Sequence, residues 1–203
     1  MLIMTNKPSK RETKREKLLD QGVHLLMSQG YHATGINEIV SAVQVPKGSF
    51  YSYFDSKENF AAQSISHYIE PFIELLTKHL QQPQVDPLTA LKNYYSELIA
   101  GVEKNGYKGG CLLGNLMGEI GDTSELCNQS IKSAVERYKL LQYNALLQAQ
   151  KEGTVRTDRS AETMANLLIN NWQGGLLRMK IEHSVQPLHE FRDTLLNDYF
   201  LPG

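Results

Sequence analysis

Apolar residues recur every three or four positions along most of this 203-residue chain, the spacing that places them on one face of an α-helix. Between residues 11 and 29, for example, one face collects Leu18, Leu19, Val23, Leu26 and Met27. The same pattern predicts further helices over residues 34–43, 46–54, 56–80, 86–102, 111–119, 122–152, 158–182 and 187–201. The chain is therefore expected to be all-α.

Glycine and small polar residues mark where these helices begin and end. Gly30 follows the apolar face of the first helix and is expected to stop it. Thr34 is the expected N-cap of the second helix, and Asp55 with Glu58 has the spacing of a capping box before the long helix. Asp158 is expected to cap the helix that follows it.

Two short predicted helices, over residues 34–43 and 46–54, are joined by a tight turn at Gln44 and Val45. This arrangement is typical of a helix-turn-helix, whose second helix lies in the major groove of DNA. On that helix, two aromatic residues are placed to anchor the buried side, namely Phe50 and Phe54. The residues that offer hydrogen bonds are Lys47, Ser49, Tyr51 and Tyr53.

The expected domain boundary lies where the long helix begins. It separates an N-terminal three-helix DNA-binding domain, residues 1–56, from a C-terminal helical domain, residues 57–203. Pro71 lies inside the long helix and is expected to kink or break it near residues 66–69. Such a kink is either the joint between the two domains or a bend fixed by packing.

The composition is that of an ordinary soluble globular protein, with 41% hydrophobic and 21% charged residues. No apolar run approaches the roughly 18 residues that a membrane-spanning helix needs. The apolar stretch over residues 1–4 stops too soon to be the core of a signal peptide. Cys111 and Cys127 are too few for a disulfide scaffold, so a cytoplasmic protein is expected.

The formal net charge of -1 hides an uneven distribution. Residues 1–17 carry six basic and two acidic side chains, a net of +4, whereas residues 61–203 carry 13 basic and 16 acidic side chains, a net of -3. A basic end on an acidic body suits a protein that presents one end to a polyanion. A solvated basic tail would explain the same charges, and the adjacent helix-turn-helix pattern favours DNA.

Residues 12–60 resemble the DNA-binding domain of the tetracycline-repressor (TetR) family. The resemblance rests on Gln29-Gly30-Tyr31, Thr34-Gly35-Ile36, Ile39-Val40, Val45-Pro46-Lys47-Gly48-Ser49-Phe50-Tyr51-Ser52-Tyr53-Phe54 and Ser56-Lys57-Glu58. Members of this family are all-helical dimers that usually repress transcription. The resemblance therefore implies that double-stranded operator DNA is the partner.

The resemblance also implies roles for individual residues. Base edges would be faced by Pro46, Lys47 and Ser49. The phosphate backbone would be held by Tyr51, Tyr53 and Lys57, and by Thr34 as the cap of the second helix. Phosphate contacts orient a protein on DNA, whereas base contacts select the sequence.

In this family the final two helices form a four-helix bundle across a two-fold axis. Here they would be residues 158–182 and 187–201 of the C-terminal domain, which the resemblance makes the ligand-binding and dimerisation domain. Gly174 and Gly175 would allow close packing at that seam, or a bend. A homodimer presents two reading helices and so implies a pseudopalindromic operator.

The segment Gly109-Gly110-Cys111-Leu112-Leu113-Gly114-Asn115-Leu116 is similar to one in a branch of the family that includes electrophile- or redox-responsive repressors. By this resemblance Cys111 would be the sensing cysteine, and Lys108 is close enough in sequence to help activate it. The alternative is that Cys111 is a small buried hydrophobic residue that contributes only to packing.

Aromatic and soft side chains of the C-terminal domain are candidates for a small-molecule pocket. They are Tyr94, Tyr95, Cys111, Met117, Tyr143 and Trp172. The alternative for each is a place in the core. The six histidines show no metal-ligand spacing, and neither a phosphate loop nor a dinucleotide fingerprint is present, so no metal or cofactor is expected.

Three functions are compatible with these patterns. The leading interpretation is a repressor that a small-molecule ligand or an electrophile releases from its operator by shifting a conformational population. The second is a constitutive DNA-binding protein without an effector. The third is an enzyme with Cys111 as nucleophile, which needs a partner histidine or carboxylate that no recognisable spacing offers. No enzymatic activity is therefore expected.

Overall fold

The computed structural model describes residues 10–104, 106 and 110–202, and within these ranges it contains helices, turns and bends but no strand. The all-α prediction is therefore confirmed. The elements are α1 (Lys10–Ala33), α2 (Ile36–Ala42), α3 (Lys47–Phe50), α4 (Lys57–Leu80), α5 (Pro87–Lys104), α6 (Leu112–Ile120), α7 (Glu125–Lys151), α8 (Ala161–Glu182), α9 (Gln186–Phe191) and the π-helical η1 (Arg192–Tyr199). None of the described helices combines the length and apolar character that crossing a membrane requires.

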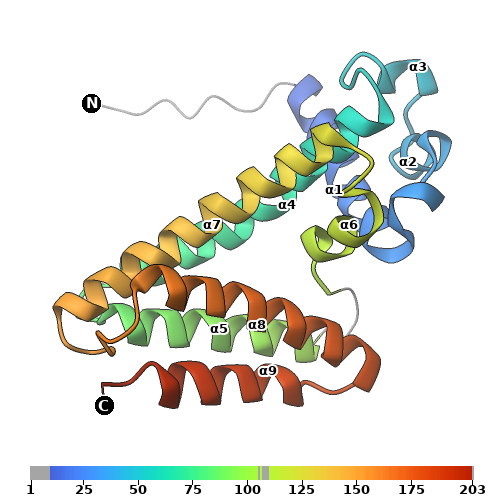
Figure 1. The fold of residues 1–203 in the computed structure, drawn as a ribbon. Coiled ribbons are helices and arrows are strands. Elements are labelled where there is room, and N and C mark those ends of the chain that lie inside the picture. The colour runs from blue at the N-terminus through green and yellow to red at the C-terminus, as the bar shows by residue number, and fades with distance from the viewer. Residues whose placement is uncertain (1–9, 105, 107–109, 203) are drawn as a thin grey trace, which may run out of the picture.

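Two long helices, α4 and α7, lie side by side and connect the two ends of the molecule (Figure 1). Helices α1, α2 and α3 gather where α4 begins, whereas α5 and α8 start near its far end and run back across the molecule, with α9 packed on α8 (Figure 1). The first nine residues of the predicted basic arm, together with Lys108 and Gly109, lie outside the described residues.

We call α1, α2 and α3 the head, and their apolar faces share a small core with the start of α4. Three phenylalanine rings meet in it: the centroids of Phe50 and Phe54 are 5.2 Å apart, and those of Phe54 and Phe60 are 4.9 Å apart. Ring pairs at such separations add to the stabilisation from apolar burial. A Cβ at Gly22 of α1 would overlap the Phe60 ring, so this close approach requires glycine. The predicted anchoring of α3 by Phe50 and Phe54 is confirmed.

We call the remaining helices the body, which surrounds a second and larger core. Helix α4 contributes to both cores, because Phe60 lies in the core of the head while Ile65, Ile69 and Leu76 lie in that of the body. One continuous helix therefore links the two units. The domain boundary between residues 56 and 57 stays a prediction.

The junction between α1 and α2 differs in part from the prediction. Gly30 has φ 82° and ψ 177°, which interrupts the helical geometry of α1 where the sequence predicted a stop. The N-cap of α2 is Gly35, so the predicted capping by Thr34 is wrong. Thr34 is 1% exposed, and its hydroxyl donates to the Gly30 carbonyl at 2.6 Å. Its side chain closes the turn after Gly30 and leaves the start of α2 uncapped by a side chain.

The cap of α4 is displaced by one residue from the prediction. Ser56 is the N-cap, and its hydroxyl accepts the backbone N–H of Asn59 at 3.0 Å. The predicted capping box of Asp55 and Glu58 is therefore wrong. Asp55 is exposed, and the Glu58 carboxylate hydrogen-bonds the hydroxyl of Ser124 at the start of α7.

The cap of α8 is likewise displaced. Ser160 is the N-cap and accepts the backbone N–H of Thr163 at 3.1 Å, so the predicted cap Asp158 is wrong. Asp158 lies two residues earlier and pairs with the guanidinium of Arg156. The charge-assisted pair with Arg156 therefore holds the Asp158 carboxylate in the turn, where it does not cap α8.

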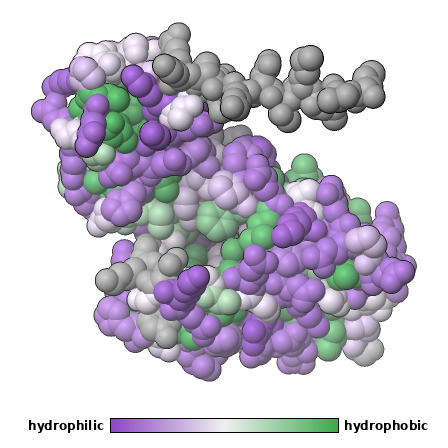
Figure 2. Space-filling view, turned by 180° about the vertical axis from the view of Figure 1, so that it is seen from behind, coloured by the Kyte–Doolittle hydropathy of each residue, from purple (hydrophilic) through white to green (hydrophobic). Residues whose placement is uncertain are grey.

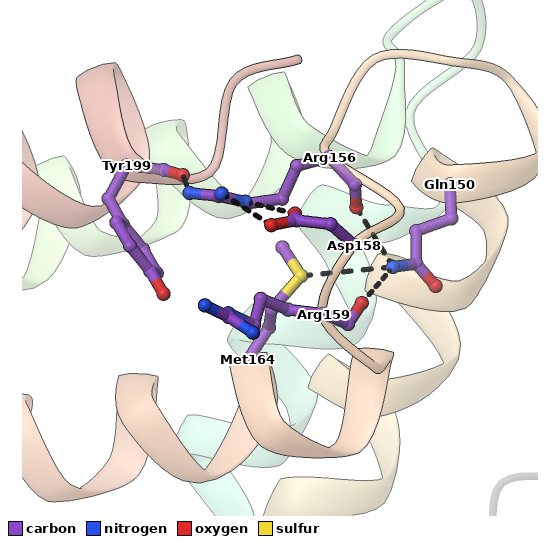
Figure 3. Close-up of polar contacts among 6 residues, drawn as sticks. All are labelled: Gln150, Arg156, Asp158, Arg159, Met164 and Tyr199. Carbon is purple, nitrogen blue, oxygen red and sulfur yellow. Dashed lines mark hydrogen bonds and ion pairs between the residues drawn. The ribbon is translucent and has the colours of Figure 1, made fainter. Parts of the chain in front are cut away.

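The same arginine ties the turn between α7 and α8 to the end of the chain. Arg156 donates to Asp158 with Nη2 and Oδ2 2.7 Å apart, and to the Tyr199 carbonyl at 3.0 Å (Figure 3). Gln150 of α7 donates to the carbonyls of Arg156 and Arg159 at 2.9 Å and 2.7 Å (Figure 3). These contacts hold the end of α7, the start of α8 and η1 in one arrangement.

The predicted break at Pro71 is absent, because α4 runs without interruption from Lys57 to Leu80. Proline removes one backbone donor and so leaves the carbonyl of His67 without its helical partner. Pro71 is exposed, so water can reach this side of the helix. Pro71 therefore does not break α4.

Candidate nucleic-acid interface and cavity

The turn between α2 and α3 sets the direction in which α3 leaves the head. Gln44 adopts a left-handed conformation with φ 55°, and the backbone N–H of Val45 donates to the Val40 carbonyl at 3.0 Å. Pro46 is the N-cap of α3 and so lies one residue before the helix, which was predicted to begin at residue 46. The helix ends at Phe50, which makes it shorter than the predicted range 46–54, and the chain continues as turns to Tyr53.

Burial of Phe50 and Phe54 leaves the opposite side of α3 facing solvent. Lys47 and Gly48 are exposed there with Pro46, and the ring of Tyr51 is 53% exposed. A Cβ at Gly48 would meet no atom within 4 Å, so a bulky ligand can approach the backbone at this point. This face combines a cation, a hydroxyl and open backbone, which are the groups that contact nucleic acid.

Three other predicted contact residues are less open. Ser49, within α3, and Tyr53, in the turn that follows it, are half-buried. Thr34 is enclosed in the head, and its hydroxyl is engaged by the Gly30 carbonyl. The structure therefore brings Pro46, Lys47 and Tyr51 together on one open face but keeps Thr34 away from it.

Lys57, at the start of α4, faces the end of α1. Its ammonium lies 4.4 Å from the centroid of the Tyr31 ring and 3.4 Å from the His32 carbonyl oxygen. Burial lowers the pKa of Lys57, and the nearby carboxylate of Glu119 partly opposes that change. Lys57 thus joins α4 to the head in addition to any contact it makes with phosphate.

A cavity of about 760 Å³ lies in the body between α4, α5, α6, α7 and α8, with Met27 of α1 reaching its wall. Most of its lining is apolar or aromatic, including Tyr68 and Phe72 of α4 and Trp172 of α8. Viewed from behind, the surface is indented between head and body, and apolar side chains are visible beside the indentation (Figure 2). A volume and lining of this kind suit a small organic ligand.

Cys111 lies on the wall of this cavity, at the N-cap of α6, and is half-buried. Gln173 of α8 donates a hydrogen bond from Nε2 to its sulfur at 3.1 Å. Burial raises the pKa of Tyr68 well above its usual value, and the adjacent Cys111 thiol raises it further. The thiol therefore has an amide donor and a neutral hydroxyl as polar neighbours.

The other cysteine, Cys127, has a different environment. It is fully buried, and burial raises the pKa of its thiol. The nearby hydroxyl of Ser124, which accepts the backbone N–H of Cys127 at 3.1 Å, partly opposes this change in pKa. A thiol that is buried and less acidic is a poor nucleophile. Cys111 is only half-buried, so it is the more accessible of the two cysteines.

The structure places the predicted cavity residues in different surroundings. Cys111 and Trp172 line the cavity, whereas Tyr94 and Tyr95 are fully buried in the core behind it. Met117 is 44% exposed on another side of α6. Tyr143 is half-buried against the large core and does not line this cavity.

Sequence reasoning missed Tyr68, Phe72 and Gln173. Tyr68 and Phe72 are an aromatic pair four residues apart on α4, with ring centroids separated by 5.0 Å. Their spacing signals one helical face but leaves open whether that face meets core or cavity. Gln173 follows Trp172 directly, and no pattern distinguishes it from an exposed polar residue.

Comparison with known proteins assigns both parts of the chain. Residues 18–63 match the family model for bacterial regulatory proteins of the tetR family, and residues 87–195 match a tetracyclin repressor-like C-terminal domain. The chain is 30% identical to the HTH-type transcriptional repressor DhaR of Mycobacterium sp. (strain GP1) over 93% of each protein. It is 29% identical to the HTH-type transcriptional repressor NemR of Escherichia coli K12 over 90% of this chain and 92% of NemR.

Solved structures agree with the sequence matches. A crystal structure of the regulatory protein TetR from Rhodobacter sphaeroides has a TM-score of 0.85 and 30% identity, covering 93% of this chain and 99% of that one. The reduced form of E. coli NemR has a TM-score of 0.86 and 27% identity, covering 94% and 99%. With two family models and a 30% identical relative along nearly its whole length, the chain belongs to the TetR family of bacterial regulatory proteins.

Proposed function

We propose that this protein represses transcription by binding a pseudopalindromic operator as a homodimer, and that a small molecule or electrophile in the cavity releases it. One observation carries the proposal: α4 begins beside the exposed face of α3 and, further along, borders a cavity that has a half-buried thiol on its wall. Relatives such as DhaR and NemR are named as repressors, which supports the direction of regulation. A DNA-bound bacterial regulator acts in the cytoplasm, the location we propose.

DNA binding is proposed for the open face of α3. Lys47 lies at the N-terminal end of the helix, where the backbone also presents unpaired N–H groups. A cation there is unfavourable for the helix alone and becomes favourable beside a phosphate or the acceptor edge of guanine. Tyr51 and Tyr53 follow α3 and are proposed to contact the phosphate backbone.

Dimerisation is proposed through α8 and the segment α9–η1. Leu177 is 57% exposed and Ile181 is 80% exposed on α8. Exposed apolar side chains on one helix favour a covered interface. Gly174 faces open space, whereas a Cβ at Gly175 would lie 2.9 Å from Leu188 of the same chain, so only Gly174 is available to a partner.

Release is proposed to begin at Cys111. An activated alkene in the cavity would accept the sulfur at its β-carbon, forming a C–S bond while the thiol proton ends on the α-carbon. The amide of Gln173 stands where it can stabilise negative charge on the attacking sulfur. A non-covalent apolar ligand that fills the same cavity would act by the same displacement of its walls.

The test is operator binding with DNA from upstream of the protein's own gene, with and without N-ethylmaleimide. Wild type and the matched control Cys127→Ser should bind the DNA and lose affinity on alkylation. Cys111→Ser should bind equally well and keep its affinity. Mass spectrometry of the same samples shows which cysteine carries the adduct.

The alternative is a constitutive DNA-binding protein without an effector. It predicts tight operator binding that neither alkylation of Cys111 nor any apolar ligand of the cavity changes. Absence of sequence-specific DNA binding in the wild type would refute both functions.

A further inference from the structure

The carboxylate of Glu119 joins the body to the head. Glu119 lies near the end of α6, and its two oxygens each accept one backbone N–H from the end of α1. The distance is 2.7 Å from the Tyr31 nitrogen to Oε2 and 2.7 Å from the His32 nitrogen to Oε1. These are charge-assisted hydrogen bonds between segments almost 90 residues apart in sequence.

Gly30 makes this contact possible. Its φ of 82° breaks the helical hydrogen bonding of α1, so the next N–H groups begin a new turn and need acceptors. A Cβ at Gly30 would lie 2.6 Å from Oε2 of Glu119, which is closer than a side-chain carbon can approach an oxygen. Glycine is therefore required here both by conformation and by the position of the carboxylate.

Glu119 also has a cation nearby. Lys57 lies over the Tyr31 ring and near the His32 carbonyl, and the negative charge of Glu119 acts on its pKa. The carboxylate of Glu119, at the end of α6, thus lies close to both the end of α1 and the start of α4. The turn from His32 to Gly35 then leads directly into α2 of the reading unit.

The opposite end of α6 borders the cavity. Cys111 precedes the helix and Leu113 lies in its first turn, and both line the cavity wall. The helix has nine residues, which corresponds to a rod of about 14 Å. A displacement of its start by a ligand therefore reaches Glu119 through one short, continuous element.

We propose that Glu119 is a positioning residue for DNA binding: its carboxylate fixes the orientation of the head on the body, and through α6 it passes the state of the cavity to α2 and α3. The second half of this statement rests on the proposed release function. The first half concerns the resting protein alone and can be tested without an effector.

The experiment compares Glu119→Ala and Glu119→Gln with the matched control Asp122→Ala. Asp122 carries the same charge three residues further on, is exposed, and makes no hydrogen bond or ion pair among the described residues. Amide hydrogen exchange should become about tenfold or more faster at Tyr31 and His32 in Glu119→Ala, and should stay at the wild-type rate in Asp122→Ala. The Gln variant keeps one acceptor oxygen and should fall between them.

Operator affinity is the second readout. Glu119→Ala should bind its operator about tenfold or more weakly than wild type, with unchanged affinity for random DNA, because the reading helices lose their fixed orientation while their charges remain. Wild-type operator affinity in Glu119→Ala would overturn the positioning role. If the wild type binds no operator at all, the proposed function fails. The role of Glu119 in ordering the head is then decided by hydrogen exchange alone: exchange in Glu119→Ala that is accelerated through α2 and α3 supports that role, and wild-type rates overturn it.

Alkylation of Cys111 in the Glu119 variant distinguishes the reaction at the thiol from the transmission of its effect to the DNA-binding helices. In Glu119→Ala, N-ethylmaleimide should add to Cys111 as completely as in wild type, while the ratio of operator affinities before and after alkylation falls toward one. An unchanged ratio would overturn transmission through Glu119. Circular dichroism and gel filtration, unchanged from wild type, verify that the variant is folded and has kept its assembly.

Discussion

The side-chain amide of Gln173 on α8 donates a hydrogen bond to the sulfur of Cys111 at the start of α6, with Nε2 and Sγ 3.1 Å apart. This contact joins two helices across the wall of the cavity. A Cβ at Gly114 would lie 2.9 Å from Oε1 of the same glutamine, so the glycine after Leu113 leaves room for it. The amide is therefore held against the thiol.

Replacing Gln173 by leucine should slow alkylation of Cys111 by about three- to tenfold, because negative charge developing on sulfur loses a hydrogen-bond donor. The rate is measured by mass spectrometry under a fixed excess of N-ethylmaleimide. Asn170→Leu, an exposed position on the same helix, is the control and should react at the wild-type rate. A rate in Gln173→Leu equal to that control would assign the glutamine to packing alone.

Replacing Lys47 by alanine should weaken specific operator binding by about 1–3 kcal/mol and relax the preference for the base pair it contacts. The comparison is Lys78→Ala, which removes an equal charge from an exposed position far along α4. Titrations with operator and with scrambled DNA provide the measurement. Equal losses on both DNAs would show that Lys47 contacts phosphate only.

Replacing Gly30 by alanine should lower the free energy of unfolding by about 1–3 kcal/mol, since alanine is strained at φ 82° and its Cβ would meet the Glu119 carboxylate. Gly35→Ala is the control, because Gly35 has φ -96° and open space around it. Denaturant unfolding gives both values.

The Gly30→Ala substitution also tests the contact between residue 30 and the Glu119 carboxylate. In a Glu119→Ala background the cost of Gly30→Ala should fall, because only the conformational strain remains. Strict additivity of the two changes would indicate that the residues do not interact.

Protonation of Glu70 should weaken the contact between α4 and α7. The hydrogen bonds from Arg137, at 2.7 Å and 3.0 Å, lower the pKa of Glu70 below its usual 4.5. A lowered folded-state pKa contributes stability above the unfolded pKa, which is lost as the pH falls through the folded value. The side chains of Arg137 and Glu70 are 48% and 43% exposed, so solvent screens the pair and its contribution is about 1 kcal/mol or less.

Glu70→Gln should therefore unfold at a lower temperature than wild type at pH 6, and the difference should disappear near pH 3. Thermal melts across this range test the pH dependence. A difference that persists at pH 3 would mean that the substitution acts through packing.

The head could be predicted closely from sequence because its features are local. A stop at Gly30, a turn at Gln44 and two anchoring phenylalanines each depend on neighbours within a few residues. The caps were less predictable, since Thr34, Asp55 and Asp158 are all suitable cap residues with another candidate one or two positions away. The choice depended on further partners, such as Arg156 for Asp158.

The cavity could be predicted only in part. Periodicity shows that Tyr94 and Trp172 face inward, but core and cavity wall have the same apolar character. Tyr94 is fully enclosed, with its hydroxyl accepting a hydrogen bond from Tyr138 at 2.7 Å, whereas Trp172 borders the cavity. The contact of Glu119 with α1 is also invisible in sequence, because it joins distant segments through backbone groups.

Helix α4 runs unbroken from the core of the head into that of the body, so in the proposed release mechanism it would act as a lever. Its 24 residues correspond to a length of about 36 Å. A tilt of about 5° about the Leu80 end of the helix would move its head end by about 3 Å, close to the rise of one base pair. Two heads on one operator must enter grooves at a fixed separation, so tilts of this size in opposite directions would put them out of register with the DNA. If release proceeds as we propose, the length of α4 would convert a rearrangement smaller than a side chain into a mismatch with the double helix.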